Sequence, residues 1–187
     1  MTMQAGQGAD LLQGVYQTPL DLLLPINRRW PICFDLAAHP NNQVVQRLGG
    51  RSGYFYSEAE DALLQSWTKE NRNIDPRGFC WLNPPFDSLG RWTKKAEVEA
   101  SKDGRFIMLL PAATGAAWLE PCRRLAQIVF LVGRPVFGFL HTKSATPDKN
   151  GNIRYRVGDP NTDPYPKDLL LAVFGEGTGV SWWKWKP

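Results

Sequence analysis

The segment GFCWLNPPFDSLGRWTKKAEVEASKDGRFIMLLP, residues 78–111, contains the pattern that decides the fold. FCWLN (79–83) and RFIMLLP (105–111) are short apolar runs, and each predicts a buried strand. The residues between them predict an amphipathic helix, with Ser88 as its N-cap and Gly104 as its stop signal. A strand, a helix and another strand in this order predict two parallel strands joined by a crossover helix. Trp92, Ala96 and Glu99 stand at helical spacing within that helix.

The same alternation of strands and helices continues on both sides of this segment. Further elements are predicted as follows: strands at 31–38, 53–56, 126–133 and 169–175, and helices at 58–67 and 114–125. The strand segments are continuous apolar runs, as expected where both faces of a sheet are covered. We therefore predict an α/β fold with a doubly wound, mostly parallel sheet.

Length predicts a single domain, because domains usually hold about 100 to 200 residues. We assign the domain to residues 15–187 and expect the Gly/Gln-rich residues 1–14 to form a flexible tail. TPLDLLLPI (18–26) predicts a short helix near the start of the domain. Thr18 is expected as its N-cap, with Pro19 in the first turn and the end of the helix before Pro25.

Composition and charge narrow the function classes. Hydrophobic residues make up 43% of the chain and charged residues 21%, which argues against a disordered or coiled-coil protein. The net charge of +4 is compatible with a polyanionic partner but too small to establish one. Three widely spaced cysteines without a CxxC pair indicate a reduced intracellular protein without a structural metal site. Without a signal peptide or an apolar run of about 20 residues, we expect neither export nor a membrane partner.

Polar or conformationally special residues follow three of the predicted strands. Asp35 ends the first strand, the NPPF segment (83–86) follows FCWL, and a turn follows Pro111. Ligands of α/β sheets bind outside the carboxyl ends of the parallel strands. We therefore expect these three places to converge on one cleft.

The NPPF segment itself has a defined chemistry. Its two prolines end the strand, fix φ at both positions and hold the preceding residue extended. The side-chain carbonyl of Asn83 and the backbone carbonyl of Pro84 can then accept hydrogen bonds from one planar NH2 group. The ring of Phe86 offers a flat face on which a base can stack. Taken alone, the four residues are read equally well as a plain turn.

The ordered series of TP, FDLAA, DAL, WLNPPF, MLLPA-T and GR-x-x-F resembles the small phage-type, Dam-like DNA N6-adenine methyltransferases. The resemblance covers roughly residues 16–175. It implies a Rossmann-like fold, S-adenosylmethionine as cofactor and DNA as partner. It also implies a phage- or prophage-encoded enzyme in the cytoplasm of a bacterium. The sequence leaves the oligomeric state open.

The resemblance also implies a set of cofactor-binding residues. Thr18 and Pro19 match the motif that helps to hold the methionine part of the cofactor. Asp35 matches the acidic residue near the cofactor's amino group, and Ala37 permits close approach of the backbone. Asp61 resembles the residue that accepts a hydrogen bond from the cofactor's adenine amine. Plain alternatives exist, with Thr18 and Asp35 as helix caps and Asp61 as a solvated helix charge.

Asn83, Pro84, Pro85 and Phe86 match the family's catalytic segment, and Asn83 also matches a residue beside the cofactor. The lone pair of adenine N6 is delocalised into the ring, so it is a poor nucleophile. Hydrogen bonds from N6–H to Asn83 and to the Pro84 carbonyl favour a more tetrahedral nitrogen. In-line attack on the methyl group of the donor then needs little more than alignment. The target base must first leave the duplex at a cost of a few kcal/mol.

DNA contacts are expected mainly in the polar insertion at 141–167, whose basic residues would bind phosphates. These residues are Lys143, Lys149, Arg154 and Arg156. Arg134 also matches a family position, as do Trp118 and Phe137, and it either contacts a phosphate or braces the end of its strand. The C-terminal SWWKWKP (181–187) suits either stacking on a nucleic-acid strand or a hydrophobic anchor that closes the fold.

Two departures from the family pattern concern the cofactor site. No glycine-rich turn follows Asp35. Between Asp35 and Glu58 no acidic residue is present to bind the ribose hydroxyls, so Asn41 and Asn42 are the substitutes we consider. Phe86 also stands where the family tends to have tyrosine. The alternatives are methylation of cytosine N4, an RNA base or a protein glutamine, and a non-catalytic nucleic-acid-binding relic of the fold.

Overall fold

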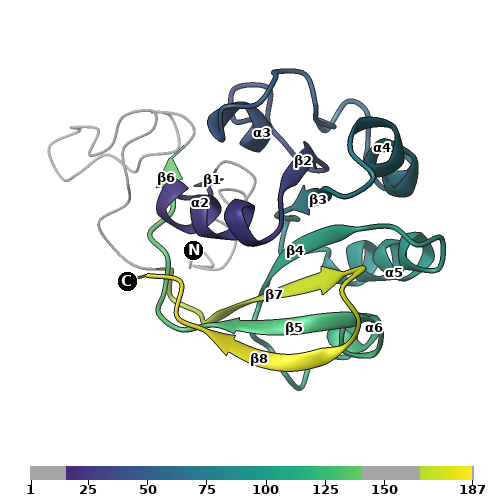
Figure 1. Cartoon of the computed structure of the whole chain (residues 1–187). Helices are drawn as coiled ribbons and strands as arrows, with labels where there is room; N and C mark the ends of the chain where they lie inside the picture. Colours follow the sequence, from purple (N-terminus) through teal and green to yellow (C-terminus); the bar gives the residue numbers. More distant parts are fainter. Residues whose placement is uncertain (1–15, 140–164, 187) are drawn as a thin grey trace, which may run out of the picture.

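The computed structural model describes residues 16–139 and 165–186 (Figure 1). The expected tail 1–14 and most of the insertion 141–167, including Lys143, Lys149, Arg154 and Arg156, lie outside the described residues. The helices are α2 (Leu20–Arg29), α3 (Val44–Arg47), α4 (Trp67–Ile74), α5 (Leu89–Ala100) and α6 (Glu120–Leu125), with a 3₁₀ turn, η2, at Ala117–Leu119. The strands are β1 (Tyr16–Gln17), β2 (Ile32–Asp35), β3 (Phe79–Leu82), β4 (Phe106–Pro111), β5 (Ala126–Leu131), β6 (Gly138–Phe139), β7 (Leu169–Phe174) and β8 (Gly179–Trp183).

The main sheet has six strands in the order β2-β3-β4-β7-β5-β8. Strands β2, β3 and β4 are parallel neighbours, and β8 is parallel to β5. Only β7 runs the other way, antiparallel to both β4 and β5. The prediction of a mostly parallel sheet is therefore confirmed. A separate two-stranded ribbon pairs β1 with β6 and lies at the end of the sheet to which the β5 and β8 arrows point (Figure 1).

Helices cover both faces of the sheet, so its central strands are buried on both sides. Residues of α4, α5 and α6 pack on one face, and residues of α2 and α3 pack on the other. The side chains of β4 and β7 alternate between the two clusters, and all six residues of each strand are buried. Trp92, Ala96 and Glu99, which stand at helical spacing in the sequence, are all buried in α5.

The helix predicted to end before Pro25 continues through it, since α2 runs from Leu20 to Arg29. A proline inside a helix removes one hydrogen bond and normally breaks the helix. Here the buried side chains of Leu22, Leu23 and Ile26 lock the helix onto the sheet, so tertiary packing overrides the local preference.

The helix predicted at 58–67 is wrong, because α4 begins only at Trp67, with Ser66 as its N-cap. Residues 58–66 form turns instead. The side chain of Asp61 accepts a hydrogen bond from the Leu63 N–H, and Asp61 itself has a positive φ of 45°. Such short-range bonds from acidic side chains offer the backbone an alternative to the helix.

Two smaller corrections concern neighbouring elements. The segment 114–125 is not one helix but the turn η2 followed by α6, whose first turn contains Pro121. The strand predicted at 53–56 is reduced to a single parallel bridge between Phe55 and Asp35.

The C-terminal segment adds strand β8 to the sheet edge and packs back onto α2. Trp185 is only 4% exposed, and Trp183 meets Trp30, the residue after α2, edge to face. The ammonium of Lys186 pairs with Asp21 of α2 at 3.3 Å. These contacts favour the anchor interpretation of the tail, although Trp182 remains 70% exposed.

Within the described ranges, no helix is long and apolar enough to cross a bilayer. In the same part of the chain, no three His, Cys, Asp or Glu side chains gather as ligands for a metal ion. The three cysteines are buried free thiols.

Candidate active site

The carboxyl ends of β2, β3 and β4 lie side by side at one edge of the sheet. Asp35 is the last residue of β2 and pairs in register with Trp81 of β3, two residues before Asn83. β4 continues the parallel register on the other side of β3 and ends at Pro111. The three strand ends therefore lie at one edge of the sheet, and the cleft that we expect there stays a prediction.

Thr18 and Asn83, 65 positions apart in sequence, meet at this edge. The side-chain Nδ2 of Asn83 donates a hydrogen bond to the Thr18 hydroxyl at 3.4 Å, and Thr18 is 3% exposed. Thr18 is therefore not the N-cap of α2, a position that Pro19 takes without any side-chain bond. This hydrogen bond to Nδ2 orients the amide plane of Asn83, and its Oδ1 points away from Thr18. No donor among the described residues bonds to that oxygen.

Asp35 is a buried carboxylate held by backbone amides. It is 2% exposed and accepts hydrogen bonds from the N–H of Ala37 at 3.2 Å and of Val44 at 3.1 Å. Val44 is the first residue of α3, so Asp35 caps the start of a helix that lies several residues further along the chain. Burial raises the pKa of Asp35 to about 7, opposed by the two amides and by the positive charge of Arg47. The capping interpretation of Asp35 is thereby supported for α3.

The backbone around Asp35 is clamped from both sides. Its N–H donates to the Tyr54 carbonyl at 3.0 Å, and its carbonyl accepts from the Tyr56 N–H at 2.8 Å. The next amide, that of Leu36, donates to the carbonyl of Trp81 in β3 at 2.8 Å. Ala37, two residues after Asp35, is partly exposed beside this clamp.

The NPPF segment ends β3 and leads directly into α5. Pro84 is buried, whereas Pro85 and Phe86 are partly exposed. The Phe86 ring meets the ring of Tyr165 edge to face, with centroids 5.9 Å apart. Sequence reasoning missed Tyr165, because an aromatic residue at the end of a polar insertion carries no signal of its own.

Arg134 follows β5 at the same edge and pairs with Asp168, which precedes β7. The Nε of Arg134 lies 2.8 Å from the Asp168 carboxylate. The Asp168 carbonyl accepts from the N–H of Ala112, the residue after β4, at 2.8 Å. Between the two roles left open for Arg134, this geometry favours bracing of the strand ends.

The other predicted residues are not brought into direct contact with Asn83 or Asp35. Asp61 sits in a turn with its carboxylate on the Leu63 amide, so it is not a helix charge. Asn42 accepts a hydrogen bond from Arg47 at 3.1 Å, and Asn41 donates its backbone N–H to His39. Trp118 lies in η2 and packs against the core.

The raised pKa of Asp35 predicts a pH dependence of stability. Between about pH 4 and pH 7 the folded state holds a proton at Asp35 that the unfolded state releases, so stability falls as pH rises through this window. We expect the fall to amount to a few kcal/mol in the wild type and to vanish in Asp35→Asn. Urea unfolding at pH 4.5 and 7.5 measures it, with Asp21→Asn at the α2 surface as control. An equal pH slope in wild type and Asp35→Asn would contradict the assignment.

Comparison with known proteins places this arrangement in a family. The family model described as DNA N-6-adenine-methyltransferase (Dam) matches residues 8–157. A DNA N-6-adenine-methyltransferase of Escherichia phage T1 is 27% identical over 124 residues, which cover 65% of this chain and 46%, about half, of the phage protein. No solved structure matches the chain. The family match spans well over half of the sequence, and the chain belongs to the DNA N-6-adenine-methyltransferase (Dam) family.

Proposed function

We propose that the protein transfers a methyl group from S-adenosylmethionine to the N6 amine of adenine in DNA. Membership of the Dam family and the name of the phage T1 relative support this reaction. They also support a phage- or prophage-encoded enzyme that acts on DNA in the bacterial cytoplasm. The residues at the carboxyl edge of the sheet support the chemistry in more detail.

The observation that carries the proposal is the hydrogen bond between Asn83 and Thr18. It uses the amide nitrogen of Asn83 and leaves the amide oxygen as an acceptor at the start of the rigid NPPF turn. An oriented acceptor at a strand end is what recognition of an N–H group requires.

The catalytic residues in this proposal are Asn83, Pro84 and Phe86. Asn83 Oδ1 and the Pro84 carbonyl each accept a hydrogen bond from one of the two N6–H groups of adenine. These hydrogen bonds favour a tetrahedral geometry at the nitrogen and localise its lone pair. Pro85 keeps this turn from rearranging. Because N6 lies inside the duplex, the base is flipped out, and stacking on Phe86 returns about 1 to 3 kcal/mol of the cost.

The residues present fit a cationic cofactor. When bound, S-adenosylmethionine supplies an activated methyl group on a positively charged sulfonium, next to a protonated amino group. Asp35 is a buried carboxylate whose pKa burial raises, so a cation nearby stabilises its ionised form. Each of its oxygens accepts one amide N–H and retains a further acceptor site. We assign cofactor binding to Thr18, Pro19, Asp35, Ala37 and Asp61. Asn83 lies beside the cofactor in this proposal, but its amide oxygen serves the substrate amine and contributes little to cofactor affinity.

DNA binding is proposed for Lys143, Lys149, Arg154 and Arg156 of the insertion, through phosphate contacts. Arg134 is retained only as a secondary contact, because its Nε is already paired with Asp168.

A methyl-transfer assay tests the reaction. Tritiated S-adenosylmethionine is offered with unmethylated DNA, adenine-methylated DNA, RNA and protein, and the labelled DNA is digested to nucleosides. We expect label only in unmethylated DNA, as N6-methyladenine. Label in N4-methylcytosine, RNA or protein glutamine would replace the proposed substrate. DNA binding without any calorimetric heat from S-adenosylmethionine would identify a non-catalytic relic.

A further inference from the structure

Three aromatic rings connect the NPPF segment with the core of the protein. Phe137 is 6% exposed and belongs to the hydrophobic cluster on the α2 face. The ring of Tyr165 lies 5.5 Å from that of Phe137 and 5.9 Å from that of Phe86, with interplanar angles of 65° and 80°. Edge-to-face contacts of this kind are the favourable arrangement of aromatic pairs. Phe86 itself packs against both hydrophobic clusters, and Tyr165 adds an edge-to-face contact to its ring.

The position of Tyr165 is set by the strand ends and not by the NPPF segment. Its backbone N–H donates to the Pro135 carbonyl at 2.9 Å. Three residues later, Asp168 is held by Arg134 and by the Ala112 amide, each at 2.8 Å. Residues 165–168 are therefore fixed to the segments that follow β4 and β5. A ring mounted on such a segment can orient a neighbouring ring.

We propose that Tyr165 is a positioning residue that fixes the ring plane of Phe86, so that Phe86 presents a defined face to the target base. The role rests on the proposed function, in which Phe86 is the stacking platform. The edge-to-face contact at 80° favours this plane of the Phe86 ring, because other ring planes would weaken the contact with Tyr165. The plane of a stacked base follows the plane of the ring beneath it, here Phe86. Small errors in the alignment of the base with the methyl donor slow the transfer strongly.

The proposal predicts a loss of turnover without a loss of cofactor affinity. An aromatic pair is worth enough beyond its buried area to change a rate by roughly 2- to 13-fold. We expect Tyr165→Leu to lower kcat for methyl transfer to unmethylated DNA by this factor, with the Kd for S-adenosylmethionine within about twofold. Tyr165→Phe keeps the ring and should restore kcat to within about twofold of the wild type, because the contact does not depend on the hydroxyl.

A double-mutant cycle with Phe86→Leu separates positioning from a general structural role. If Tyr165 acts through Phe86, Tyr165→Leu has no further effect on kcat once Phe86 is leucine. Equal losses in both backgrounds, or Tyr165→Phe as slow as Tyr165→Leu, would overturn the positioning role. If Tyr165→Leu lowers the thermal midpoint too far for assay, Tyr165→Met, whose flexible side chain adapts better to the space left by the ring, enters the cycle instead. A wild type that methylates no DNA would overturn the proposed function as well, whereas an active wild type without coupling overturns only the role of Tyr165.

Discussion

Asn83→Ala is expected to abolish methyl transfer while leaving cofactor binding nearly intact. The substitution removes the acceptor for the substrate N–H, an interaction that strengthens as the nitrogen becomes tetrahedral. Loss of one such preorganised hydrogen-bonding group costs roughly 100- to 1,000-fold in kcat. The neighbouring prolines and the strand end remain, so the turn itself persists. Single-turnover methylation of unmethylated DNA measures the rate, and calorimetric titration with S-adenosylmethionine measures the affinity.

Asn73→Ala provides the matched control for this prediction. Asn73 is an exposed residue of α4, and it should leave both rate and affinity unchanged. A parallel loss of rate and cofactor affinity in Asn83→Ala would mean that the NPPF segment is a structural turn. A rate that stays within a few-fold of the wild type would remove Asn83 from the chemistry altogether.

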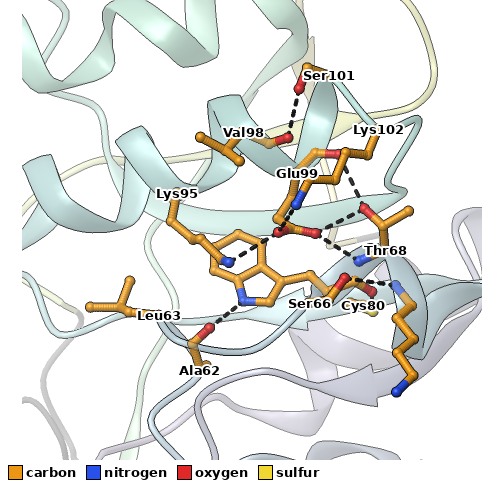
Figure 2. A network of polar contacts seen from close by, with 12 residues as sticks. Ala62, Leu63, Ser66, Thr68, Cys80, Lys95, Val98, Glu99, Ser101 and Lys102 are labelled. Atoms are coloured by element: carbon orange, nitrogen blue, oxygen red, sulfur yellow. Dashed lines mark hydrogen bonds and ion pairs between the residues drawn. The ribbon is translucent and has the colours of Figure 1, made fainter.

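The second large effect is expected at Glu99, a fully buried carboxylate in α5 (Figure 2). Its Oε1 lies 3.0 Å from both Lys95 and Lys102, and its Oε2 accepts from the N–H and the hydroxyl of Thr68 at 3.0 and 2.9 Å. Thr68 lies in the first turn of α4, so one carboxylate ties the start of α4 to α5. Burial alone would raise the pKa of Glu99, but the Thr68 amide and the two ammonium groups lower it to about 2.

Glu99→Ala should lower the free energy of unfolding by about 3 to 5 kcal/mol, because it leaves the buried Thr68 amide and the Lys95 charge without their partner. Glu97→Ala on the same helix is the matched control, since Glu97 pairs with Arg124 at the exposed surface and should cost less than about 1 kcal/mol. Urea unfolding at pH 7 compares the two. Similar losses of unfolding free energy in both variants would show that the buried network around Glu99 stabilises the fold no more than a surface ion pair does.

The lowered pKa of Glu99 adds a pH signature opposite in sign to that of Asp35. The carboxylate contributes its stability above about pH 4.5 and loses it as pH falls toward 2, because in this range the unfolded state binds a proton that the folded state does not. Glu99→Gln should therefore flatten the acid limb of the stability curve. An unchanged acid limb would contradict the ion-pair assignment.

The sequence predicts the sheet well because its strands are buried on both faces. Apolar runs such as FIMLLP are buried most favourably in the middle of such a sheet. The strand that ends at Asp35 and the strand that precedes Asn83 then lie side by side through topology alone. The resemblance identified the family, which the comparisons confirm. It also pointed to Thr18 and Asn83, which are in contact.

What could not be predicted depends on contacts between distant residues. Nothing local indicates that α2 continues through Pro25, because the buried leucines that hold it act through the sheet. The turns at 58–66 arise from side-chain bonds that compete with helix formation. The contact of Tyr165 with Phe86 joins positions 79 residues apart in sequence. Hydrophobic periodicity and secondary-structure propensity depend on residues close in sequence, so they do not predict contacts between such distant pairs.

The docking of β8 and its flanking tryptophans on α2 has a consequence for the order of folding. Thr18 immediately precedes α2, and this helix region contacts Trp183 and Lys186, which lie far from it in sequence. Contacts of such long sequence separation form late and slow folding. The βαβ core around Asn83 can form from segments that are close in sequence, but the Thr18 side of the site is completed only when these distant segments meet. The two halves of the site would therefore form at different stages of folding.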